Sequence, residues 1–183
     1  MSLPFPGHNA PSARFEVPLE MLAACHHRVE RQCQTLQRLV KHLTTHEVDE
    51  DARAAAAAVL RYFDTAARDH HADEETDLFP ALLESVAGSD PICIRELVAS
   101  LIADHRTIEV QWRILRPKLV AIAAGEARIL AAADVDPLIA LYEQHIAREE
   151  AELLPMAARL LSDSTLDVIG RAMRVRRGIG DDD

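Results

Sequence analysis

The sequence predicts an all-α protein, arranged as an up-down-up-down four-helix bundle with an irregular N-terminal arm and a short C-terminal helix. Three observations favour this fold class. Aromatic residues make up only 4% of the chain and glycines number six, a composition that suits helices better than strands. Apolar residues recur at steps of three and four, as on one face of a helix. The long stretches with this pattern are separated by short connections, for which an antiparallel bundle is the simplest packing.

The chain of 183 residues has the usual length of one domain. Residues 1–16 are rich in Pro, Gly, Ser and Asn and are expected to form the irregular arm. The bundle is predicted over residues 17–161. Residues 162–183 are then left for the short helix and a tail.

The first two bundle helices have clear start and stop signals. An apolar stripe runs from about Pro18 to Thr45 and predicts the first helix. Asp49 is a suitable N-cap for the second helix, which is expected to continue to Ala87 and to stop at Gly88.

Similar signals define the remaining helices. Ser89 as a cap and Pro91 in the first turn predict the start of the third helix. Three prolines fall inside helical patterns, where each is expected to kink or loosen a turn: Pro80, Pro117 and Pro155. The other predicted bounds are Ala124 for the end of the third helix, Asp136 to Leu161 for the fourth, and Ser164 to Arg177 for the C-terminal helix, with a Ser164-x-x-Asp167 capping box.

An internal repeat links the second and fourth helices. Segments 70–80 and 145–155 both begin with His, have Glu at the fourth and fifth positions after it, and end in Leu-Phe-Pro or Leu-Leu-Pro. Residues four apart lie on one face of a helix, so His70 and Glu74 should project together. This face carries core residues, and a buried carboxylate is costly unless a cation binds it. The residues that follow, Glu75 and Glu150, lie about 100° off this face and are expected to form hydrogen bonds beside the ligands or interhelical salt bridges.

The first and third helices each have a histidine within the apolar stripe. Apolar residues stand 4 positions before and 3, 7, 10 and 14 positions after both His26 and His105. This register selects His26 over His27, which points about 100° away on an ideal helix.

The four helices thus direct six imidazole or carboxylate groups inward. Such groups suit iron, manganese or zinc, and no thiolate is required. Six ligands exceed the needs of one tetrahedral ion, whereas two bridging glutamates could hold a pair of metals and leave a coordination position open. The predicted ligands are His26, His70, Glu74, His105, His145 and Glu149.

The motifs resemble those of the hemerythrin-like family, the HHE cation-binding domains, over about residues 17–161. The resemblance implies two non-haem irons per chain, as an oxo- or hydroxo-bridged pair, with the four histidines terminal and the two glutamates bridging. Members of that family bind dioxygen, sense iron, oxygen or nitric oxide, or help to repair iron–sulfur centres. Oxygen carriers have His-x3-His on the third helix, whereas Leu101 and Glu109 flank His105 here. His71 could occupy the vacant ligand position, or could lie beside the ligands.

The expected function is binding or sensing of a small ligand, oxygen or nitric oxide, or of iron itself. A di-iron oxidase or peroxidase, an iron–sulfur repair protein and a metal-free structural bundle are the alternatives. The Glu-x-x-His motif of ferritin-like enzymes is absent from the chain, so an enzyme is less expected. Trp112 and Tyr142 should pack in the core or line a small pocket. The core stripes supply few polar groups to orient an organic substrate.

Charge and hydropathy restrict the partners and the compartment. A net charge of −10 disfavours nucleic acid and anionic membranes as partners. The sequence shows no membrane span and no secretion signal. The three cysteines have no Cys-x-x-Cys spacing and are expected to be free thiols in a reducing compartment. A cytoplasmic location is therefore predicted.

Overall fold

The computed structural model describes residues 18–86 and 92–179. Within these residues all regular structure is helical, which confirms the predicted all-α class. No described helix is long and apolar enough to cross a membrane. The predicted arm at residues 1–16, the stop at Gly88 and the helix start at Ser89 lie outside the described residues.

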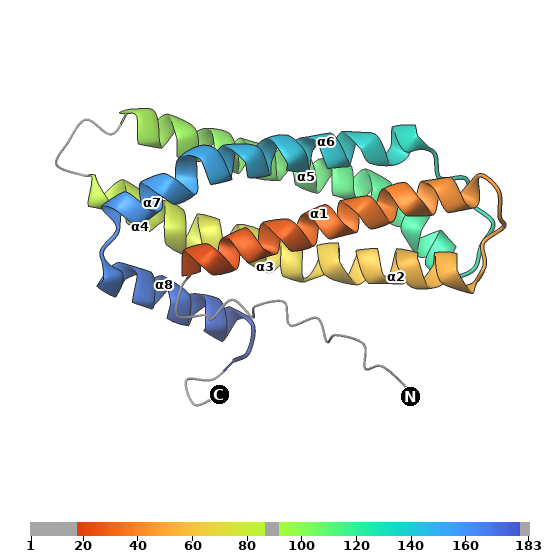
Figure 1. Cartoon of the computed structure of the whole chain (residues 1–183), viewed down its shortest axis with the longest axis horizontal. Helices are drawn as coiled ribbons and strands as arrows, with labels where there is room; N and C mark the ends of the chain where they lie inside the picture. Colours follow the sequence, from red (N-terminus) through yellow and green to blue (C-terminus); the bar gives the residue numbers. More distant parts are fainter. Residues whose placement is uncertain (1–17, 87–91, 180–183) are drawn as a thin grey trace, which may run out of the picture.

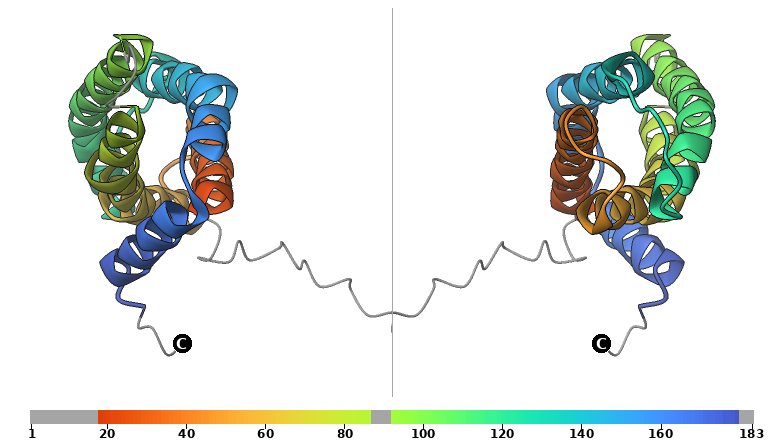
Figure 2. Two further views of the ribbon diagram at one scale, coloured as in Figure 1. Left: turned by 90° about the vertical axis from the view of Figure 1, so that its left-hand side faces the viewer. Right: turned by 90° about the vertical axis from the view of Figure 1, so that its right-hand side faces the viewer.

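The described residues form five helical rods. Helical elements that follow one another along the chain without a loop are counted as one rod. Four rods lie lengthwise and enclose a common core, whereas the fifth, α8, lies outside them at one end (Figures 1 and 2). Around the core, α1 contacts α2 and α6, and α5 contacts the same two helices. The elements are α1 Pro18–Leu43, α2 Glu50–Asp64, α3 Ala66–Ala72, π-helix η1 Asp73–Leu78, α4 Phe79–Ser85, α5 Ile92–Ala123, α6 Ala132–Arg148, π-helix η2 Glu149–Leu153, α7 Leu154–Leu160 and α8 Asp163–Arg176.

The predicted second and fourth helices each contain a π-helical turn at the same place in the repeat. The Phe79 N–H donates to the Glu74 carbonyl, and the Leu154 N–H donates to the Glu149 carbonyl. Each bond spans five residues, which is the π-helical spacing and widens the turn. In both widened turns, therefore, the carbonyl that accepts the π-helical bond belongs to the glutamate of the repeat.

The prolines that follow explain these turns. Pro80 and Pro155 lack the N–H that would continue the α-helical ladder, and their rings crowd the preceding turn. The prediction that they loosen a turn is confirmed. Pro117, by contrast, lies inside the uninterrupted helix α5.

A second interruption, at Thr65, was not predicted. Thr65 separates α2 from α3 and has φ −128° and ψ −84°. Its hydroxyl donates to the carbonyl of Arg61 over 2.6 Å, and its N–H donates to the carbonyl of Tyr62, three residues before it, over 3.3 Å. The predicted single second helix is thus divided into shorter pieces.

The cap residues correct three predicted boundaries. The first helix ends at Leu43, two residues early. The fourth begins at Ala132 and not near Asp136, because the Asp134 carboxylate accepts the N–H of Ala131 over 2.9 Å. The Ser164-x-x-Asp167 capping box was wrong: α8 is capped by Ser162, which accepts the N–H of Thr165 over 3.2 Å. Asp49 is confirmed as a cap, accepting the Ala52 N–H over 2.9 Å.

Two clusters of buried apolar residues fill the space that the four lengthwise rods enclose. One includes Leu36 and Leu119, and the other includes Leu78 and Leu153. His26 lies on α1 between residues of the two clusters and is itself fully buried. A polar layer is therefore enclosed between two apolar ones.

Candidate metal centre

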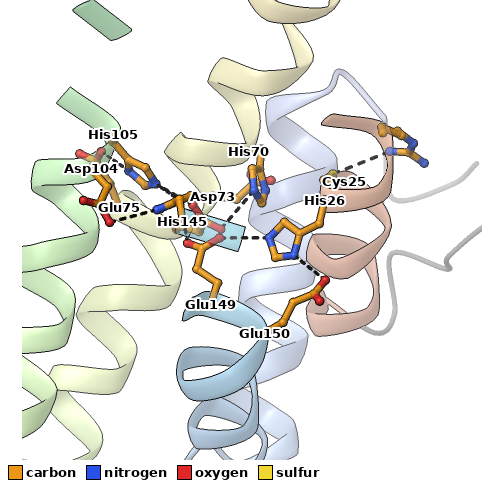
Figure 3. Close-up of polar contacts among 12 residues, drawn as sticks. Cys25, His26, His70, Asp73, Glu75, Asp104, His105, His145, Glu149 and Glu150 are labelled. Carbon is orange, nitrogen blue, oxygen red and sulfur yellow. Dashed lines mark hydrogen bonds and ion pairs between the residues drawn. The ribbon is translucent and has the colours of Figure 1, made fainter. Parts of the chain in front are cut away.

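The structure brings together all the side chains predicted as ligands, in the polar layer of the interior. Helices α1 and α5 supply one histidine each, and the two repeat segments supply a histidine and a glutamate each. Figure 3 labels the four histidines and Glu149. The six side chains are at most 2% exposed: His26, His70, Glu74, His105, His145 and Glu149.

The register on α1 is confirmed by exposure. The side chain of His26 is 0% exposed, whereas that of His27 is 67% exposed. Only His26 therefore reaches the polar layer.

These residues form two groups that share both glutamates. One group contains His26 and His70, and the other contains His105 and His145. In each group, ligand atoms of the two histidines and of Glu74 and Glu149 all lie within 4.8 Å of one another. The spacing suits one metal ion in each group.

The two carboxylates are oriented to serve both groups at once. Glu149 places Oε2 3.1 Å from Nε2 of His26 and Oε1 3.1 Å from Nε2 of His145. Glu74 places Oε1 3.4 Å from Nε2 of His70 and Oε2 3.2 Å from Nε2 of His105. Each glutamate thus offers one oxygen to each group, as a bridging carboxylate would.

The inward-facing atoms lack the hydrogen bonds that buried polar atoms normally have. All four carboxylate oxygens of Glu74 and Glu149 are buried without a hydrogen-bond partner, as is Nε2 of His26. Nε2 atoms of His105 and His145 face each other at 3.0 Å. Orphaned acceptors of this kind are costly in a protein interior, and cations satisfy them. The residues therefore fit a metal ion.

The outer nitrogens of two histidines are fixed by the second glutamates of the repeat. Nδ1 of His105 donates to Glu75 over 2.8 Å, and Nδ1 of His26 donates to Glu150 over 3.1 Å. A proton held at Nδ1 leaves the lone pair on Nε2 directed inward, which is the tautomer that a metal requires. The expected hydrogen-bonding role of these glutamates is confirmed.

Burial and neighbouring charged groups shift the pKa values of the candidate ligands. Burial, with the nearby charge of Glu149 added, raises the pKa of Glu74 well above its usual range. Burial would also raise the pKa of Glu149, but the adjacent imidazoles of His145 and His26 lower it well below its usual range. Burial lowers the pKa of His70 well below the ordinary value, so this imidazole is neutral and able to act as a ligand.

His71 belongs to a third group, with His105 and His145, whose ring nitrogens also lie within 4.8 Å of one another. Its ring stacks on that of His105, with centroids 4.0 Å apart and planes at 11°. Nε2 of His71 is buried without a hydrogen-bond partner. His71 thus adjoins the His105 group and has a free nitrogen.

Sequence reasoning missed a buried ion pair next to the site. Asp73 is 0% exposed and binds Arg176, the last residue of α8, and the C-cap residue Arg177, with Nη2 of Arg177 2.6 Å from Oδ2. The repeat held a weak signal, because Asp73 occupies the position that corresponds to Arg148 and breaks the match. The pairing with α8 had no sequence motif.

Comparison with known proteins agrees with this geometry. The chain is similar to a protein of Haemophilus influenzae, described as uncharacterized, with 32% identity over 167 residues that cover 91% of this chain and 94% of the relative. The family model described as hemerythrin HHE cation binding domain matches residues 17–157. The chain therefore belongs to the hemerythrin HHE cation-binding domain family.

Proposed function

We propose that this protein is a non-haem di-iron protein of hemerythrin type, in which the four lengthwise rods act as an up-down-up-down bundle around the metals. The observation that carries the proposal is the bridging orientation of the two glutamates. Each carboxylate places its two oxygens beside histidines of different groups. A single ion would not need both oxygens in this arrangement. Imidazole and carboxylate ligands suit iron.

The assignment of ligands is part of this proposal. His26 and His70 would hold one iron, His105 and His145 the other, and Glu74 and Glu149 would bridge them. His71 is the further candidate ligand of the second iron, because its ring nitrogen lies near those of His105 and His145. An iron pair supplies a centre that changes oxidation state and can take a small ligand such as oxygen or nitric oxide.

The proposed ligand is diatomic because the surroundings of the six ligands are mostly apolar. The polar layer lies between two clusters of buried apolar residues, which favour a small ligand of low polarity. The six main ligands also do not saturate two six-coordinate irons, so a position remains for a small molecule or for His71.

Rapid mixing of the reduced, iron-loaded protein with oxygen or nitric oxide tests this function. We expect a new absorption band that forms without sustained turnover of an organic substrate. If His71 occupies the open position, the band should form faster in His71→Ala than in the native protein. An unchanged spectrum in both proteins would contradict an accessible iron pair.

A further inference from the structure

A pocket of about 600 Å³ lies on the side of the bundle, between the α2–α3 segment and α5. This volume is within the range of small-molecule sites. Its apolar wall contains three aromatic side chains, Phe63, Trp112 and Tyr142, with ring centroids of Phe63 4.9 Å from those of Trp112 and 5.4 Å from those of Tyr142. The pocket can therefore accept a planar apolar group.

The same pocket is lined by charged residues in addition to the aromatic ones. Four of the lining residues are arginines, and three are acidic. The arginines were not recognised from the sequence because they lie outside the core stripe. They are Arg68, Arg106, Arg113 and Arg116.

The acidic residues of the pocket already have arginine partners. Asp64 accepts a hydrogen bond from Nε of Arg116 at 2.9 Å, one from Nη2 of Arg116 at 2.8 Å, and one from the Trp112 indole at 3.0 Å. Glu75 and Glu109 both pair with Arg106.

Two of the lining arginines remain unpaired. Among the described residues, Arg68 and Arg113 take part in no hydrogen bond or ion pair. Two guanidinium groups are therefore available to an anion at a pocket whose own acids are occupied, in a chain with a net charge of −10.

The floor of the pocket touches the candidate metal centre. His71 lines the pocket, is only 7% exposed, and its Nε2 has no hydrogen-bond partner. The same ring stacks on His105. A molecule in the pocket is thus separated from the metal ligands by one imidazole.

We propose that this pocket binds a small organic anion that has a planar apolar group, with arylacetic acids as the model class. The apolar group would stack on Trp112, which is only partly buried, whereas Phe63 and Tyr142 are 2% and 3% exposed and pack behind it in the core. The carboxylate would bind Arg68 and Arg113, whose planar guanidinium groups suit carboxylates. The proposal rests on the pocket alone and does not require the metals to be iron.

Calorimetric titration of the iron-loaded protein with phenylacetate tests the proposal, with the neutral phenethyl alcohol as the matched compound. We expect saturable phenylacetate binding and at least about tenfold weaker binding of the alcohol, because only the anion can pair with guanidinium. Trp112 is the one tryptophan of the chain, so its fluorescence should change as phenylacetate binds. Equal binding of both compounds, or no change in Trp112 fluorescence, would overturn the proposal.

Variants locate the anion contact. The double variant Arg68→Gln, Arg113→Gln should weaken phenylacetate binding at least about tenfold. Arg128→Gln, at an exposed position between α5 and α6, should bind as the native protein does. Phenylacetate affinity that is unchanged in the double variant, with an altered iron absorption spectrum, would place the carboxylate on the metal and overturn the proposal. If the protein binds phenylacetate in this pocket but is found to hold no iron pair, only the proposed di-iron function is contradicted.

Discussion

At the scale of single residues, neighbouring histidines on α1 have opposite environments. His26 contacts Glu149 and Glu150 in the interior, whereas His27 contacts only Glu30 at the surface. We expect His26→Ala to lose bound iron and His27→Ala to keep it, as measured by the metal content of the purified variants. Equal losses from the two variants would contradict the register of α1.

A second residue-scale prediction concerns Glu75, which holds Nδ1 of His105. Removal of such a partner typically lowers metal affinity about 10- to 100-fold. We expect Glu75→Ala to lose iron to a competing chelator at concentrations that spare the native protein. Glu109→Ala is the matched control, because within the described part of the chain Glu109 pairs with Arg106 and forms no hydrogen bond with His105. Equal resistance of the two variants would show that Glu75 does not orient His105.

The sequence was informative about residues that obey helical spacing. His70, Glu74, His145 and Glu149 were found because the repeat places them on inward faces, and the structure brings them together. Asp73 was missed because its partners, on α8, are about a hundred residues away, and no local pattern relates them. Contacts between distant segments depend on how the helices pack, which single-sequence periodicity does not specify.

At the scale of elements, α8 is fastened to the π-helical turn that carries Glu74. Arg176 and Arg177 enclose the carboxylate of Asp73, the residue before Glu74. Burial raises the pKa of Asp73 even though both arginines act to lower it. The buried carboxylate thus needs both arginines to offset its charge, and the arginines would lose their shared partner without it.

We expect Asp73→Ala to destabilise the protein by about 3 kcal/mol, because it leaves two partly buried arginines without their shared partner. Asp77→Ala is the control in the same turn. Asp77 meets only Arg176, over 2.7 Å, and is 17% exposed, so its loss should cost about 1 kcal/mol or less. Urea unfolding of the iron-loaded variants measures the difference. Equal losses would mean that burial of Asp73 has no special role in stability.

The interruptions of the helices show which features the sequence rules could not specify. Pro80 and Pro155 predicted a loosened turn, and the structure has one before each. The rules did not specify a π-helix, because the widened turn also depends on the packing of the glutamate that it carries. The break at Thr65 was also not predictable, because Thr35 and Thr107 make the same hydroxyl bond to the fourth residue before them without interrupting α1 or α5.

At the scale of the whole molecule, the site has an approximate twofold pattern. The α1 histidine meets Glu149 and Glu150 of the fourth rod, and the α5 histidine meets Glu74 and Glu75 of the second. The internal repeat predicted that the second and fourth rods supply matching ligands, but not which rod each of them would meet. The lateral pocket breaks the pattern, since His71 and the arginines that line it have no counterparts in the other half of the repeat.

The iron content of protein produced in iron-supplemented medium tests the central claim most directly. Because Glu74 and Glu149 each direct one oxygen to both histidine groups, we predict about two irons per chain, measured by atomic emission against the protein concentration from amino-acid analysis. Glu149→Ala should lower both the iron content and the melting temperature, because the remaining buried carboxylate loses its cation. A single zinc or a single iron per native chain, found reproducibly, would contradict a bridged iron pair.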